Sequence, residues 1–116
     1  MTHTVTLLAN HKGITVPRVI GDEYVVDANI NINSYTEDGE VITASSLGLD
    51  TITAVVISGA ETASGVALER FVVELSTAGE YESTGSFKLV GTTASSGSES
   101  ANSDLGMVRI RAYGNI

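Results

Sequence analysis

The chain alternates most regularly over residues 24–33, which read Tyr24-Val25-Val26-Asp27-Ala28-Asn29-Ile30-Asn31-Ile32-Asn33. Every second side chain from Tyr24 is apolar, and four of the five side chains between them are polar. Because successive side chains of a strand point to opposite faces, this pattern predicts a strand with one buried face and one mostly polar face.

Shorter segments along the chain are also typical of strands, since they are rich in β-branched residues and are bounded by turn residues. Pro17 precedes the short apolar segment 18–20, and proline is tolerated at a strand start or a sheet edge because it has no N–H to donate. Thr43 can cap a single helical turn near residues 44–47, which Gly48 would end. The other predicted strands cover residues 4–9, 41–43, 51–58, 66–75, 86–90 and 107–113.

These elements predict a single all-β domain over residues 1–116, an antiparallel β-sandwich (jelly-roll-like) or a barrel with at most one short helical turn. Hydrophobic residues make up 42% of the chain and aromatic residues only 5%, so the core must be built mainly from aliphatic side chains. Residues 92–103 are rich in serine and are predicted to form a flexible loop. We expect the following side chains to face inward: Tyr24, Val26, Ala28, Ile30, Ile32, Leu47, Leu49, Val55, Ile57, Phe71, Val73 and Leu75.

Charge and composition exclude several classes of function. The net charge is −8, from 14 acidic and 6 basic residues, and such a field repels phosphate backbones, so we expect no nucleic-acid partner. The chain has no cysteine, which excludes disulfides and thiolate metal sites. The first ten residues lack the features of a secretory signal peptide, and no apolar run approaches the roughly 20 residues of a membrane span. We therefore expect synthesis in a cytoplasm and no membrane contact.

The sequence contains few residues in patterns typical of catalytic or metal-binding sites. His3 and His11 are the only histidines, and a metal site needs at least three converging ligands, so two polar residues at strand ends are the favoured interpretation. The carboxylates near Glu37 lack the aromatic platforms or deep cleft of a glycosidase. We therefore expect no catalytic residue, no metal and no cofactor. The polar face of residues 27–33 is either a hydrogen-bonding surface for a partner or simply a solvated face.

Three segments follow the order found in a group of small phage proteins. They are Arg18-Val19-Ile20-Gly21, the alternating segment 24–33, and residues 39–55, which run Gly39-Glu40-Val41-Ile42-Thr43-Ala44-Ser45-Ser46-Leu47-Gly48-Leu49-Asp50-Thr51-Ile52-Thr53-Ala54-Val55. In this order the chain resembles the head decoration or cement proteins, and related minor structural proteins, of tailed-phage virions. The resemblance covers roughly residues 18–116 and is most specific over 39–55. The serine-rich loop departs from the pattern.

The resemblance implies a structural protein that binds and stabilises the outside of a phage capsid, with the major capsid protein lattice as its partner. The alternative is a carbohydrate- or receptor-binding β-sandwich of a phage tail or fibre, which the scarcity of aromatic residues disfavours. We also expect self-association as dimers or trimers. Arg109 and Arg111 either pair with acidic groups of a neighbour or only make a surface strand soluble. The candidate partner-binding residues are Thr4, Thr6, Tyr35, Glu37, Arg109 and Arg111.

Overall fold

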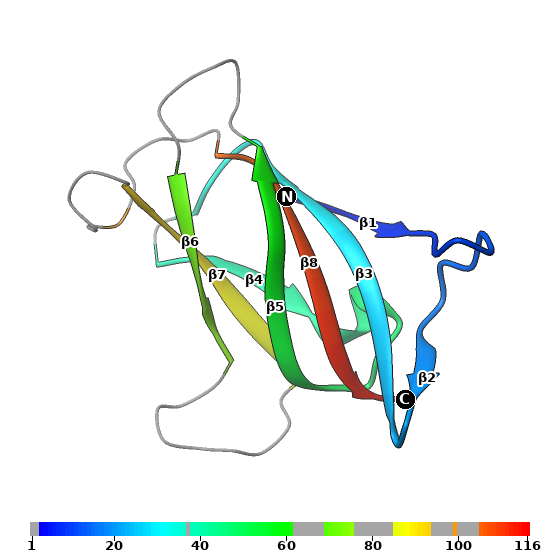
Figure 1. Cartoon of the computed structure of the whole chain (residues 1–116). Helices are drawn as coiled ribbons and strands as arrows, with labels where there is room; N and C mark the ends of the chain where they lie inside the picture. The colour runs from blue at the N-terminus through cyan, green and yellow to red at the C-terminus, as the bar shows by residue number, and fades with distance from the viewer. Residues whose placement is uncertain (1–2, 37, 62–68, 76–84, 94–98, 100–104) are drawn as a thin grey trace.

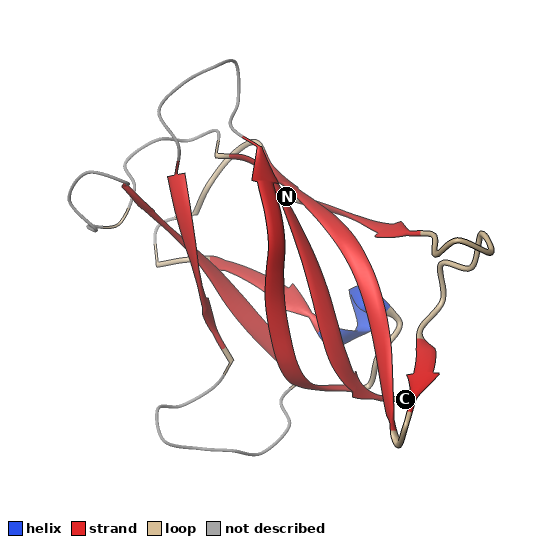
Figure 2. Ribbon diagram, viewed as in Figure 1, coloured by secondary structure: helices blue, strands red, loops and turns tan. Residues whose placement is uncertain are grey.

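A computed structural model describes residues 3–36, 38–61, 69–75, 85–93, 99 and 105–116. Within these residues the fold consists of two antiparallel sheets and one short helical turn (Figure 1, Figure 2). The strands form two separate sheets there, so the all-β prediction is confirmed and the sandwich is favoured over a closed barrel.

The larger sheet contains five strands. They are β1 (Thr4–Leu8), β2 (Arg18–Ile20), β3 (Glu23–Ile32), β5 (Thr51–Glu61) and β8 (Gly106–Asn115). The order is β1-β3-β8-β5, and β2 pairs with β3 beside β1. The predicted strands over 24–33, 51–58 and 107–113 are therefore confirmed as β3, β5 and β8.

Strands β1 and β2 lie on the same edge of β3, one after the other. β1 pairs with residues 27–31 and β2 with residues 23–25. The chain between them, residues 9–17, leaves the sheet and forms a projecting loop (Figure 1).

The smaller sheet contains β4 (Glu40–Thr43), β6 (Glu69–Glu74) and β7 (Ser86–Thr93), in the order β4-β7-β6. β6 confirms the described part of the predicted strand 66–75, whose first residues, 66–68, lie outside the described part. β7 is longer than predicted, since Thr92 and Thr93 pair with β6. Thr92 and Thr93, the first two residues of the predicted loop 92–103, thus belong to β7, and Glu99 forms an isolated bridge with Thr92. The other residues of the predicted loop lie outside the described part of the chain.

The helical turn η1 (Ala44–Leu47) lies where the sequence predicts it. Thr43 Oγ1 accepts a hydrogen bond from the backbone N–H of Ser46, and Gly48 ends the turn at φ 79°, a left-handed conformation that glycine adopts without strain. The turn buries Ala44 and Leu47.

The core fills the space between the two sheets. The inward-facing residues of β3 are fully buried from Val26 to Ile32, and Tyr24 packs against them. Phe87 and Leu89 of β7 contribute from the smaller sheet. The predicted inward set is confirmed, with six members buried and six partly buried against the core: Val26, Ala28, Ile30, Ile32, Leu47 and Leu49, and then Tyr24, Val55, Ile57, Phe71, Val73 and Leu75.

The outer face of β3 differs from a solvated polar face. Val25 is fully buried there, and Asp27 is only 6% exposed. Asn29 is half-buried, while Asn31 is exposed. One end of this face is therefore covered, and the charged residues that cover it form the candidate site.

Candidate functional site

The outer face of the larger sheet gathers charged side chains around Asp27. In the register of the sheet, Asp27 of β3 lies opposite Arg111 of β8. Arg109 lies opposite Asn29, two residues along on the same face. On the other side Arg18 of β2 lies opposite Val25. The twofold periodicity of the strands thus places three arginines around one carboxylate.

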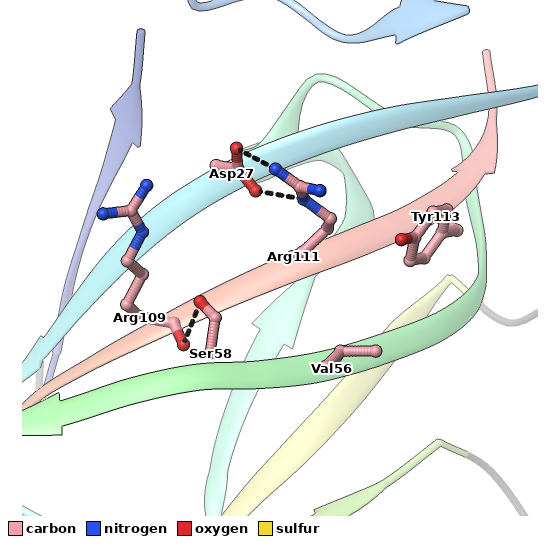
Figure 3. A pocket seen from close by; sticks show the side chains of 6 residues that line it. All are labelled: Asp27, Val56, Ser58, Arg109, Arg111 and Tyr113. Carbon is pink, nitrogen blue, oxygen red and sulfur yellow. Dashed lines mark hydrogen bonds and ion pairs between the residues drawn. The ribbon is translucent and has the colours of Figure 1, made fainter. Parts of the chain in front are cut away.

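The pair formed by Asp27 and Arg111 is bidentate (Figure 3). Arg111 Nε donates to Asp27 Oδ1 at 2.7 Å, and Arg111 Nη2 donates to Oδ2 at 3.0 Å. Arg18 Nη2 lies 3.6 Å from Oδ2 of the same carboxylate. Parallel hydrogen bonds of this kind fix the orientation of the guanidinium group as well as its position.

These contacts shift the ionisation of both partners. The hydrogen bond from Arg111 lowers the pKa of Asp27, against the opposing effect of burial, and the charges of the three arginines lower it further. The same hydrogen bond raises the pKa of Arg111. The pair is therefore ionised at neutral pH.

Two hollows open beside this pair. The first, of about 410 Å³, lies over β3, β5 and β8, with the ring of Tyr113 at one side (Figure 3). The second, of about 800 Å³, lies between the outer face of the sheet and the projecting loop, and we call it the basic pocket. Both hollows share Asp27, Arg109 and Arg111. The other residues of the basic pocket are Ala9, Asn10, His11, Lys12, Ile14, Pro17, Arg18, Val19 and Ile20.

The basic pocket concentrates the positive charge of an acidic chain. Of the six lysines and arginines in the sequence, four line it: Lys12, Arg18, Arg109 and Arg111. Asp27 is the one carboxylate among the described residues that line it, which leaves a local surplus of three positive charges.

The loop that walls the pocket is held at both ends. The side-chain oxygen of Asn10 accepts hydrogen bonds from the backbone N–H groups of Lys12 and Ile14, at 2.8 and 3.0 Å. At the other end Pro17 packs so close to Gly48 that a Cβ there would lie 3.1 Å from Pro17 Cδ. The wall is thus organised by its own contacts before any partner binds.

Four of the six candidate partner-binding residues lie on the larger sheet. Thr4 and Thr6 are exposed on β1, and Thr6 lies opposite Asn29, in the same row as Arg109. Arg109 makes no side-chain ion pair with the described residues, so it is available to a partner. Arg111 is paired with Asp27, a contact that neither of the two alternatives predicted for it included.

Tyr35 is partly buried against the core. Its hydroxyl donates to Glu99 Oε2 at 2.6 Å and accepts from the backbone N–H of Gly91 at 3.2 Å. Burial, followed by the hydrogen bond with Glu99, raises the pKa of Tyr35 to about 12. Glu37 lies outside the described residues.

The histidines do not converge. His3 Nδ1 lies 2.7 Å from Oε1 of the buried Glu40, whose Oε2 accepts the backbone N–H of Thr36, while His11 lines the basic pocket. Among the residues that the structure describes, there is no group of three side chains suited to hold a metal ion.

The sequence reasoning missed Asp27, Arg18 and Lys12 as parts of this site. Asp27 was recognised only as one of a row of polar residues. Arg18 lies on the short strand before β3, and the pairing of β2 with β3 brings it to Asp27. The available signal was weak: a lone acid on the polar face of one strand and two arginines on one face of another.

No family model, curated protein or solved structure matches this chain. No helix in the described part of the chain is long and apolar enough to cross a membrane.

Proposed function

We propose that the chain is a structural virion protein that binds the outside of a phage capsid and stabilises it. The observation that carries a binding role is the basic pocket, because an acidic chain collects most of its basic residues there, next to exposed apolar side chains. Surface residues that only confer solubility need no such clustering.

The identity of the partner rests on the resemblance of residues 39–55 to decoration and cement proteins. A protein lattice suits the charge of the chain better than nucleic acid does, since a net charge of −8 repels phosphate backbones at long range. Within this negative field, the basic pocket attracts acidic groups at short range. It therefore favours a partner that brings isolated acidic groups.

In this proposal, the chain gains its affinity for the capsid from the assembly of the capsid subunits into a shell. A site shared by several capsid subunits exists only after they are arranged in the shell, and each weak contact gains from the effective concentration of the others. The chain would then bind assembled heads far better than free capsid protein. Self-association as a dimer or trimer at a symmetry axis would add further contacts.

A binding experiment tests the proposal. The chain is mixed with emptied, expanded heads and, separately, with the same major capsid protein before assembly, and bound protein is measured by sedimentation. We expect binding to heads alone and a higher temperature of head disruption. Equal binding to both forms, or unchanged heat resistance, would contradict the proposal, and binding to a glycan instead would favour the receptor-binding alternative.

A further inference from the structure

The cations that line the basic pocket differ in whether they contact Asp27. Arg111 and Arg18 both contact Asp27, whose side chain is 8% exposed. Arg109 and Lys12 make no side-chain ion pair with the described residues. The carboxylate of Asp27 therefore offsets part of the positive charge, and the remaining cations face the hollow without a counter-charge.

Arg18 also has an unused donor. Its Nη1 is buried and has no hydrogen-bond partner among the described residues. A buried donor without a partner costs free energy that an acceptor would recover. The Arg18 side chain is 21% exposed and lines the pocket, so this donor belongs to a guanidinium group that an anion in the pocket would contact.

Apolar side chains lie beside the cations. Ile14 and Ile20 line the pocket and are each at least 40% exposed. A free inorganic ion would leave these side chains in water. A segment of protein chain that carries both an acid and apolar neighbours would cover them.

We infer that the basic pocket binds an acidic segment of a partner protein, with an aspartate or glutamate carboxylate at Arg109, Lys12 and Arg18 and an apolar neighbour on Ile14 and Ile20. Charge complementarity selects the acid, and the apolar rim selects a peptide over a lone anion. A second copy of this chain is a poorer occupant of the pocket, since its net charge of −8 opposes docking between free molecules. Self-association at a symmetry axis of the shell would use other surfaces. The inference rests on the proposed function for one point, that the partner is a protein, and it adds the chemistry that this partner brings to the pocket.

A short peptide serves as the probe. The peptide leucine–glutamate–leucine, blocked at both ends so that the glutamate is its only charge, is titrated into the full chain while backbone amides are followed by NMR. We expect shifts at Lys12, Ile14, Arg18 and Arg109. The matched peptide with glutamine in place of glutamate should bind roughly tenfold more weakly, because it loses the charge-assisted hydrogen bonds.

Substitutions of single cations test whether the peptide binds in the basic pocket. Arg109→Gln and Lys12→Gln remove cations that make no ion pair with described residues, and each should weaken peptide binding by about threefold or more. Lys88→Gln is the control, since it removes the same charge from the exposed face of β7 in the other sheet and should leave binding unchanged. Equal effects of all three variants would show a general charge effect and overturn the inference.

Two further outcomes would also overturn it. Inorganic phosphate that binds as tightly as the peptide would show that the apolar rim contributes nothing. A salt-sensitive dimer that Arg109→Gln abolishes, seen by sedimentation, would make a second copy the occupant. The peptide test is independent of the heads. Peptide binding without head binding would support the inference about the basic pocket and contradict the proposed function. Head binding that Arg109→Gln and Lys12→Gln do not change would support the proposed function and contradict the inference about the pocket.

Discussion

Asp27 organises the charged residues on the outer face of the larger sheet. It is nearly buried, it accepts two hydrogen bonds from Arg111, and it lies 3.6 Å from Arg18. One carboxylate therefore holds two guanidinium groups at the edge of the basic pocket. This role makes Asp27 a positioning residue for the pocket as well as a source of stability.

Replacement of Asp27 tests this role. Asp27→Asn should lower the free energy of unfolding by about 2 kcal/mol at pH 7, since it leaves Arg111 and Arg18 without their counter-charge. The folded-state pKa of Asp27 is lowered, so its contribution is present above the ordinary value of 3.8 and is lost as the pH falls through the folded-state pKa. The difference between wild type and variant should therefore shrink at low pH.

Urea denaturation at pH 7 and at pH 3 measures the difference. Asp22→Asn is the control, because Asp22 lies exposed in the turn between β2 and β3. A loss that is no larger for Asp27→Asn than for Asp22→Asn, or that is the same at both pH values, would show that the pair is not a stabilising contact.

At the scale of elements, the local parts of the fold were predictable and the pairing of distant strands was not. The η1 turn was predicted to the residue because its cap, Thr43, and its end, Gly48, are contained in one short segment. The strand β3 was predicted because its alternation is uninterrupted. The pairing of Asp27 with Arg111, 84 residues apart, depends on β3 lying next to β8, which no local pattern encodes.

The basic pocket was missed for the same reason. Its residues come from the projecting loop and from three strands, and the sequence places only Arg109 and Arg111 on a common face. The contacts of Tyr35 with Glu99 and Gly91 were not predicted either. Both features arise from tertiary contacts between segments that are distant along the chain.

The contact between β5 and β8 requires a glycine at position 114. A Cβ added to Gly114 would fall on the carbonyl oxygen of Thr51, so the two backbones would have to separate. Gly114→Ala should therefore lower the free energy of unfolding by about 2 kcal/mol or more. The control is Gly59→Ala on β5, where an added Cβ would lie 3.9 Å from Arg109 Cβ, an ordinary contact. Thermal unfolding compares the two, and equal stability would mean that the strands do not approach so closely.

At the scale of the whole molecule, charge and topology act together. The sandwich buries its aliphatic core between the sheets and, in the described part of the chain, carries a hollowed, positively charged area on a molecule of net charge −8. Such an uneven distribution steers a partner toward one face while the rest of the surface resists unspecific association. A protein that attaches to a shell in one orientation needs this property.

The orientation of the chain on a capsid tests the proposed function most directly. An electron cryomicroscopy map of heads with the protein bound would show which face contacts the shell. We expect the outer face of the larger sheet, with Arg109 and the projecting loop of residues 9–17, to be buried against acidic groups of the capsid protein. A map in which this face points to solvent while the smaller sheet contacts the shell would contradict the role assigned to the basic pocket.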